Sequence, residues 1–410
     1  MTVSQAAPGA APAVTPSDWI NYTNTAARVI MWPGAIADMG GEVDALGCRR
    51  LMVVCGPNTR RSGVLKRVLD ALGGRVQHLF DRVVEHSAVA LVEEAAELAR
   101  EHRIDGFVAV GGGSASDTAK AVAILLAEGG RLPEHASRFV PPDRFYPKDL
   151  PSPKLPVIAV PTTASAAEVT PGLGIRDADG RKLLFWHVTL ASRLIVLDPA
   201  ANVEVPAPIV AATAMNAFAH CAEGLYSRLR NPISEGLALH GIRILTKAIP
   251  AMVAEPDEVG HRAGVLAGAH LSGMVISNAR VGIHHAVCHC LGALGGLSHG
   301  VANAIMLPHA LAYNLPVAAG ALATMAEAMG AATGVGGRDL DEAAAARAGI
   351  EAVRKLQHDA GVPTRLRDAG LAEDMLPAIA EHTLADRGLY FNPRPTASAE
   401  PILELLKRAW

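Results

Sequence analysis

The sequence of 410 residues is short of basic charge, of aromatic residues and of cysteine. Lysine and arginine number 37 against 40 acidic residues, so the chain lacks the basic surplus that nucleic-acid binding needs. Only five cysteines occur, none in a CxxC pair, which argues against a disulfide framework and for a reducing compartment. Because hydrophobic residues make up 50% of the chain and charged residues 19%, an intrinsically disordered protein is also excluded.

The chain also lacks an uninterrupted apolar run of the roughly 20 residues that span a bilayer. Residues 1–25 have neither the basic start nor the apolar segment of a signal peptide, and their Ala, Pro, Ser and Thr content predicts a disordered tail. We therefore expect a cytoplasmic protein that acts on a small molecule, with no nucleic-acid partner and no membrane.

Short apolar runs alternate with helical stretches over residues 26–203. Such runs are typical of strands buried on both faces, in a parallel sheet covered by helices on both sides. Residues 128–156, rich in Pro, Arg and Asp, interrupt the pattern and are expected to be an irregular insertion. We predict strands over 28–32, 51–55, 75–80, 106–110, 157–160 and 193–198.

Residues 204–410 show a different pattern, with long alanine-rich stretches that are apolar at positions i, i+3 and i+4. No comparable strand run follows, so this half is expected to be all helical. The predicted fold class is therefore α/β: an N-terminal dinucleotide-binding domain with a parallel sheet, followed by an all-α C-terminal domain that carries substrate and catalytic residues.

Two loops that follow predicted strands contain residue types that suit a dinucleotide. Glycines after the strand at 106–110 let the backbone approach a pyrophosphate, and the helix that follows offers free N–H groups. Hydroxyls after the strand at 157–160 lie at the carboxyl edge, where open α/β sheets bind ligands. Each loop alone has an equally good packing or turn explanation, but together they predict a nucleotide site. Its predicted residues are Gly111, Gly112, Gly113, Ser114, Asp117, Thr162, Thr163, Ser165 and Asn58.

The strand at 51–55 ends without the carboxylate that would hold the ribose of NAD and repel a 2′-phosphate. NADH and NADPH are therefore both allowed as cofactors.

Histidines gather in three segments of the helical half. Asn216 and His220 are four residues apart, so they share one helix face, and His285 and His289 repeat this spacing. His299 and His309 follow. Neutral imidazole is both a transition-metal ligand and a proton shuttle. The alternative explanation is that these are core histidines whose ring nitrogens are hydrogen-bonded within the protein. Several histidines beside a nucleotide-binding fold favour an active site instead.

Several motifs in order resemble the iron-containing alcohol dehydrogenase superfamily, and within it most closely the maleylacetate reductases. They are GGGSASDTAK, PTTASAAEVTP, MNAFAHCAE, HHAVCHCLG, LSHGVANAIMLPH and FNPRP. The resemblance runs from about residue 26 to the end and implies an active site between an α/β and a helical domain. Metal-dependent members use Asp-His-His-His ligands, whose positions fall on Asn216, His220, His285 and His299. His289 would then be an active-site histidine that is not a ligand.

The asparagine at position 216 replaces an anionic oxygen donor with a neutral one, as in the maleylacetate reductases. Hydride addition to a C=C bond conjugated to a ketone gives an enolate that hydrogen bonds can hold, so a metal is dispensable. The resemblance thus implies NADH- or NADPH-dependent reduction of maleylacetate, or a related oxo-enoate, to 3-oxoadipate in aromatic-compound catabolism. We expect a homodimer in which His289 or His285 donates the proton, beside His220, His299 and Asn216.

Iron or zinc at His220, His285 and His299 is possible, but it is not expected to be required. Three features differ from the maleylacetate reductases. Ala286 stands where lysine is usual in those enzymes. Arg280 is a candidate to replace this cation, although an arginine is expected to be exposed unless other evidence places it in a site. Asp117 and the LSHGVANA motif are more like the metal-dependent alcohol dehydrogenases, and Trp186 with His187 is like neither group.

Three other functions stay open. The first is an iron- or zinc-dependent dehydrogenase that acts on a small aldehyde or alcohol. The second is a lyase resembling dehydroquinate synthase, and the third is a nucleotide-binding protein without catalytic activity.

Overall fold

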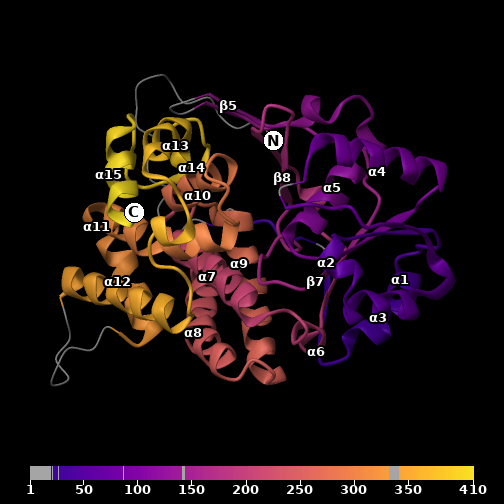
Figure 1. The fold of residues 1–410 in the computed structure, drawn as a ribbon, viewed down its shortest axis with the longest axis horizontal. Helices are drawn as coiled ribbons and strands as arrows, with labels where there is room; N and C mark the ends of the chain where they lie inside the picture. The colour runs from indigo at the N-terminus through magenta and orange to yellow at the C-terminus, as the bar shows by residue number, and fades with distance from the viewer. Residues whose placement is uncertain (1–19, 21, 26, 86, 141–143, 332–340) are drawn as a thin grey trace.

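The computed structural model describes residues 20, 22–25, 27–85, 87–140, 144–331 and 341–410. One region is built around a sheet and the other is a bundle of helices, and the β8–β9 hairpin described below lies where the two meet (Figure 1). Most of the predicted tail at 1–25 lies outside the described residues. Within it, the Thr23 N–H donates to the side-chain oxygen of Asn278, at 2.7 Å.

The sheet has six parallel strands in the order β1-β10-β7-β4-β2-β3, and all six were predicted from the sequence. Every residue of the four inner strands is buried, as expected for strands covered on both faces. The strands are β1 (Arg28–Met31), β2 (Leu51–Val54), β3 (Val76–Phe80), β4 (Gly106–Gly111), β7 (Val157–Pro161) and β10 (Leu194–Leu197).

Helices cover both faces of this sheet. Apolar side chains of α4 and α5 pack on one face, and those of α1 and α3 pack on the other. The helices of this region are α1 (Met39–Ala45), α2 (Pro57–Arg60), α3 (Gly63–Leu72), α4 (Val89–Glu101), α5 (Gly113–Glu128) and α6 (Pro199–Asn202).

Two antiparallel hairpins were not predicted from the sequence. β5 (Arg138–Val140) pairs with β6 (Arg144–Tyr146), so the expectation that the 128–156 insertion is irregular throughout is wrong. β8 (Gly172–Arg176) pairs with β9 (Lys182–Trp186), and the Ser137 N–H donates to the Leu184 carbonyl and docks the insertion on β9. Strands of three to five residues are too short for a period of two to stand out in the sequence.

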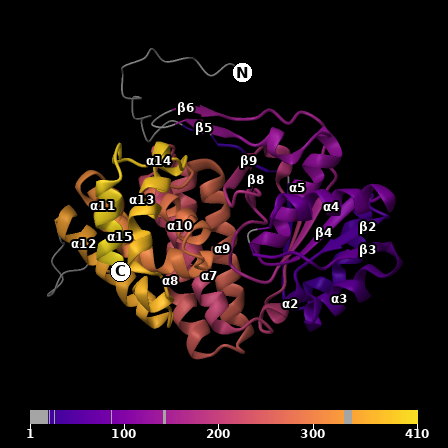
Figure 2. The ribbon, with the colours of Figure 1, turned by 45° about the horizontal axis from the view of Figure 1, so that its top comes forward.

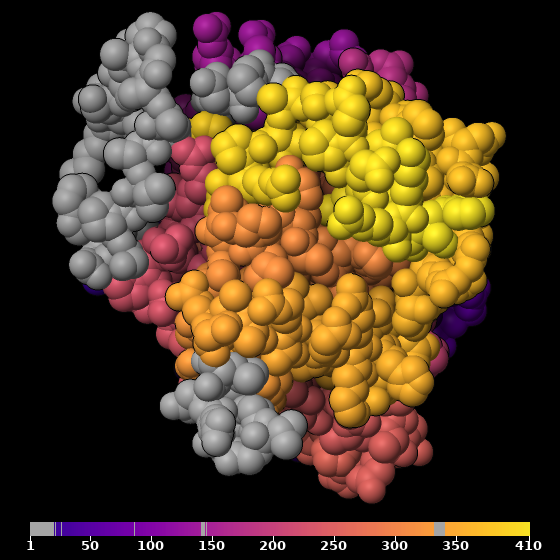
Figure 3. All heavy atoms as spheres, turned by 90° about the vertical axis from the view of Figure 1, so that its left-hand side faces the viewer, coloured from indigo at the N-terminus to yellow at the C-terminus, as the bar shows by residue number. Residues whose placement is uncertain are grey.

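The second region is entirely helical among the described residues, as predicted. Its central helix α7 is buried along most of its length and contacts α8, α9 and α11 (Figure 2). C-terminal helices coloured orange and yellow form the face that lies away from the sheet (Figure 3). The helices are α7 (Ala207–Tyr226), α8 (Pro232–Ala254), α9 (Val259–Ala279), α10 (Ile283–Ala293), α11 (His299–Met329), α12 (Glu342–Asp359), α13 (Leu376–Thr383), α14 (Gly388–Phe391) and α15 (Glu400–Ala409).

Two of these helices, α8 and α11, are long and apolar enough to cross a membrane by length and composition alone. The apolar window is 39% buried in α8 and 50% buried in α11, and both helices pack within the bundle. Core helices of soluble proteins meet the same criterion, so this is weak evidence for a membrane span.

Hydrogen bonds join the two regions at the carboxyl edge of the sheet. The Ala164 N–H donates to the Thr213 hydroxyl on α7 at 3.1 Å, and the Asn202 side chain donates to the Thr162 carbonyl at 2.8 Å. The buried Arg262 of α9 donates to the Asn202 carbonyl at 3.1 Å. The loop after β7 is therefore held between the sheet and the bundle.

Candidate active site

The two predicted cofactor loops lie side by side. β4 and β7 are neighbouring strands, with Gly111 opposite Pro161, so the residues that follow them share one edge of the sheet. The Thr162 N–H donates to the Gly111 carbonyl at 2.9 Å. The sequence order alone does not say that these two strands are adjacent.

The glycines let the second loop approach the first closely. A Cβ atom at Gly112 would lie 3.4 Å from the Thr163 hydroxyl, and one at Gly113 would lie 3.3 Å from the Ser165 hydroxyl. Among the residues that the structure describes, no side chain caps the N-terminus of α5, so its first N–H groups remain available to a phosphate. The glycine cradle and this uncapped helix end fit the pyrophosphate of a dinucleotide.

The other three predicted cofactor residues have different surroundings. Ser114 is half-buried, and its carbonyl accepts from the Thr118 hydroxyl at 2.7 Å. Asp117 turns towards β8, where its carboxylate accepts from the Gly174 N–H at 3.1 Å, so it anchors the β8–β9 hairpin. Asn58 is exposed on α2 and accepts from the side chain of Arg61.

Replacing Gly111 by alanine should lower the free energy of unfolding by about 1–3 kcal/mol, because its φ of +135° is unfavourable for residues with a side chain. Gly112→Ala is the matched control for the fold, since Gly112 has a φ of −78°. It should unfold normally but bind NADH more weakly, because its methyl group occupies the approach to the pyrophosphate. Urea unfolding and NADH fluorescence titrations measure both effects, and equal stability of the two variants would contradict this account.

The predicted histidines come together in the helical region. The His220 and His285 rings stack with centroids 4.8 Å apart, and His285 lies 5.7 Å from His299. His289 stacks on His299 at 5.8 Å. His309 does not take part in these ring contacts, and it lies near Arg354 and Arg408 instead.

His285 is held by hydrogen bonds on both sides of its ring. Its Nδ1 contacts a carboxylate oxygen of Glu223, and its Nε2 lies 3.0 Å from the side-chain oxygen of Asn216. A carboxylate only accepts, so Nδ1 carries the proton and Nε2 of the neutral ring is an acceptor. The Asn216 amide satisfies this acceptor when it turns its NH₂ group towards the ring.

Burial keeps the rings of His220 and His285 neutral near pH 7. Burial lowers the pKa of His285 to about 4, although Glu223 acts in the opposite direction. Burial also lowers the pKa of His220 well below its usual value, and His285 adds to this effect. For the Glu223 carboxyl, burial raises the pKa, but His285 and His284 outweigh it and hold the pKa below its usual range.

His289 forms a second pair with a residue far away in the sequence. Its Nδ1 lies 2.7 Å from a carboxylate oxygen of Asp386, whose other oxygen accepts from the Gly388 N–H, also at 2.7 Å. This arrangement fixes Nδ1 as the donor and leaves Nε2 for a substrate. Burial and the nearby Lys182 lower the pKa of His289, whereas Asp386 raises it.

Within the described part of the chain, we consider two groups of side chains as holders of a metal ion. The sequence predicted His220, His285 and His299, with Asn216 as a neutral fourth donor. A second group, not predicted, is Glu223, His284 and His285, whose ligand atoms lie within 4.8 Å of one another.

In this second group the carboxylate already accepts from both histidines and from the Gly282 N–H. The predicted set of three imidazoles suits an ion such as Zn²⁺ or Fe²⁺ by donor type, although it lacks an anionic oxygen. Among the described residues, only the second group has ligand atoms that all lie within 4.8 Å of one another.

The β8–β9 hairpin brings an aromatic ring and cations to the histidines. The Arg280 guanidinium lies 3.5 Å from the centroid of Trp186, and that of Arg387 lies 5.8 Å from it. Lys182 on β9 is near Asp386 and His289. Arg280 is half-buried, so the default expectation that it is exposed is wrong.

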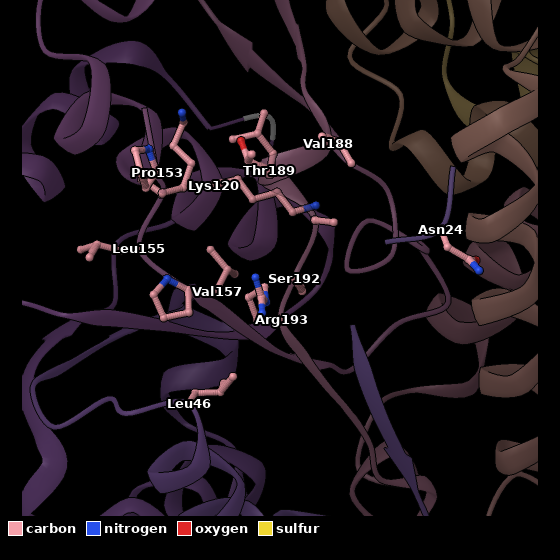
Figure 4. A pocket seen from close by; sticks show the side chains of 15 residues that line it. Asn24, Leu46, Lys120, Pro153, Leu155, Val157, Val188, Thr189, Ser192 and Arg193 are labelled. Atoms are coloured by element: carbon pink, nitrogen blue, oxygen red, sulfur yellow. The ribbon is translucent and has the colours of Figure 1, made fainter. Parts of the chain in front are cut away.

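A separate cavity of about 540 Å³ lies at the amino ends of β7 and β10 (Figure 4). Val157 and Arg193 line it, together with Thr189 and Lys154. It is at the opposite end of the strands from the glycine run, and none of the predicted site residues lines it. It is therefore distinct from the site that the histidines form.

Sequence reasoning missed five polar residues of this site: Lys182, Glu223, His284, Asp386 and Arg387. Glu223 follows His220 by one helical turn, so its position on α7 is a signal that the sequence contains. Asp386 is 97 residues from His289 and lies between α13 and α14, where no local pattern marks it.

Comparison with known proteins matches residues 26–199 to the family described as iron-containing alcohol dehydrogenase, and residues 210–410 to the C-terminal part of that family. A maleylacetate reductase of Pseudomonas sp. (strain P51) is 32% identical over 383 residues, or 93% of this chain and 95% of that protein. The lactaldehyde reductase of Escherichia coli (strain K12) is also 32% identical, over 92% of this chain and 96% of that protein.

A solved structure of 1,3-propanediol oxidoreductase matches with a TM-score of 0.88 and 30% identity, covering 96% of this chain and 100% of that one. The names of these three proteins refer to different substrates. The substrate therefore has to be argued from the side chains of the site.

Proposed function

Since this chain belongs to the iron-containing alcohol dehydrogenase family and is an oxidoreductase, we propose that it reduces maleylacetate, or a related oxo-enoate, with NADH or NADPH. One observation carries the proposal. The side-chain amide of Asn216 lies 3.0 Å from Nε2 of His285, at the position that the resemblance aligns with an aspartate ligand of metal-dependent relatives, and a neutral amide with its NH₂ group towards the ring donates to this nitrogen. An aspartate there would place a carboxylate oxygen next to the lone pair of an imidazole nitrogen. Both atoms are acceptors, so a metal cation or a proton would have to lie between them.

The side chains support reduction of a conjugated C=C bond. Hydride addition to the alkene carbon moves charge onto the ketone oxygen, which becomes an enolate. The Asn216 amide has two N–H bonds, so when its NH₂ group faces Nε2 of His285 one of them bonds to that nitrogen and the second is available to this oxygen. His289 bonds to Asp386 through Nδ1, so it transfers a proton from Nε2 only in its doubly protonated, imidazolium form, which the Asp386 carboxylate stabilises. Transfer of this proton completes the reduction to a 3-oxoadipate-type product and leaves the neutral ring.

A metal ion would be held by His220, His285 and His299, where it would supply Lewis-acid polarisation of the substrate oxygen. The proposed reaction does not depend on it, because the enolate is delocalised and the hydrogen-bond donors of this chain face the same site.

The test is oxidation of NADH and NADPH by the purified protein with maleylacetate, before and after exhaustive chelation. We expect turnover that resists chelation, with 3-oxoadipate as the product. Absence of turnover with either cofactor would overturn the proposed substrate. Turnover that chelation abolishes would keep the substrate and overturn the metal-free mechanism.

A second candidate is metal-dependent reduction of a small aldehyde, which the three clustered imidazoles and the likeness to lactaldehyde reductase favour. It predicts that the protein retains Fe²⁺ or Zn²⁺ through purification. It also predicts that lactaldehyde is turned over faster than maleylacetate, and one kinetic comparison in the presence of added metal decides between the two.

A further inference from the structure

Three cations from distant parts of the chain gather around Trp186. Lys182 comes from β9, Arg280 follows α9 and Arg387 precedes α14. The Arg280 guanidinium lies on the indole ring, with Arg387 on the same ring and Lys182 on the same hairpin. All of these side chains are half-buried, so each is shielded by protein on one side and retains exposed surface on the other.

This gathering of charge is costly in the structure as it stands. Burial and the neighbouring Arg387 lower the pKa of Arg280 to about 9. Two carboxylates lie near Lys182: Asp386 already accepts from His289 and from the Gly388 N–H, and Asp117 accepts from the Gly174 N–H. Within the described part of the chain, no carboxylate lies within ion-pair distance of Arg280, and its Nη1 atom is buried without a hydrogen-bond partner.

The backbone of Arg280 is also strained. Its φ of 69° and ψ of 179° fall in a region that is almost restricted to glycine. A glycine would fit this position better, so the arginine is retained at a cost to the fold. Backbone strain at a residue whose charge has no carboxylate partner in the described part of the chain indicates that the side chain binds a ligand.

We propose that Arg280, Arg387 and Lys182 form, against Trp186, a subsite that binds a carboxylate of the substrate and selects dicarboxylates over neutral carbonyl compounds. The subsite adjoins His289, so a carboxylate bound there would lie close to the carbon that is reduced. The guanidinium face stacks on the indole, and its N–H edge remains for a paired, charge-assisted contact with the carboxylate. This inference rests on the proposed function, because the carboxylate that the subsite would bind belongs to the proposed class of substrate.

The probe for the test is adipate, a saturated six-carbon dicarboxylate that cannot be reduced at a C=C bond. Its binding to the NADH-loaded enzyme is measured by calorimetry, beside hexanoate and 1,6-hexanediol, which carry one charge and none. We expect adipate to bind the unaltered protein at least about tenfold more tightly than hexanediol.

Arg280→Gly removes the guanidinium and relieves the backbone, so this variant should melt at the same or a higher temperature. Its adipate affinity should fall by about 10–100-fold, the range expected for the loss of a charge-assisted pair. The matched control is Arg367→Gln, because Arg367 lies 5.6 Å from the ring of Trp410 on the surface and should not affect adipate.

Unchanged adipate binding by Arg280→Gly, or equal binding of adipate and hexanediol by the unaltered protein, would overturn the subsite. Its failure can be told apart from that of the proposed function. Turnover of maleylacetate that does not depend on Arg280 would rule out the subsite and leave the proposed function intact. Adipate binding that depends on Arg280, without turnover of maleylacetate, would support the subsite and rule out the substrate proposed above.

Discussion

Replacing His289 by asparagine is expected to lower kcat for maleylacetate reduction by about 10²–10⁴-fold, the usual contribution of a positioned proton donor. The reason lies in the contact with Asp386, which engages Nδ1 as a donor and stabilises the imidazolium form, whose second proton on Nε2 is the one transferred. The KM for NADH should change little, because the glycine run and the hydroxyl loop belong to other elements. Steady-state kinetics of the variant measure both quantities.

Two further variants make this result specific. Asp386→Asn keeps the imidazole but removes the carboxylate that orients it, so it should also reduce kcat, though by less. His309→Asn is the control, since His309 is a half-buried histidine of the same region that lies outside the site. A His289→Asn variant that keeps more than half of the kcat would show that the proton comes from elsewhere.

Replacing Asn216 by aspartate should convert the pair formed by the Asn216 amide and the His285 imidazole into a metal site. Without metal, the carboxylate lies against the lone pair of His285 and must take up a proton or remain unsatisfied. The metal-free variant should therefore lose about 1–3 kcal/mol of unfolding free energy. Its affinity for Zn²⁺ should rise by at least about 100-fold, because even outer-shell partners of a metal contribute 10–100-fold.

Thermal melting with and without Zn²⁺ tests this prediction directly. At a concentration 100 times its dissociation constant, the ion should restore about 2.7 kcal/mol to the variant. Asn216→Leu has a similar volume but adds no charge, so it should be destabilised without gaining zinc affinity. If Asn216→Asp binds zinc no better than the unaltered protein, then His220, His285 and His299 are not arranged as a metal site.

The sequence alone was sufficient for the fold class and for the groups of residues that share an element. The four inner strands are buried, continuous apolar runs, and they stand out in the sequence together with the edge strands β1 and β3. The spacing of Asn216 with His220, and of His285 with His289, places each pair on one helix face whatever surrounds the helix. The motifs around these residues also indicate the family, which the comparisons confirm.

The tertiary structure decided which distant residues complete the site. Asp386 reaches His289 across 97 residues, and the β8–β9 hairpin brings Trp186 from the sheet region to Arg280 of the helical region. No local pattern marks such residues, because their role depends on the packing of separate elements and not on the periodicity of one. The hairpin itself was missed for the same reason, since its strands are short and Asp117 anchors it from α5.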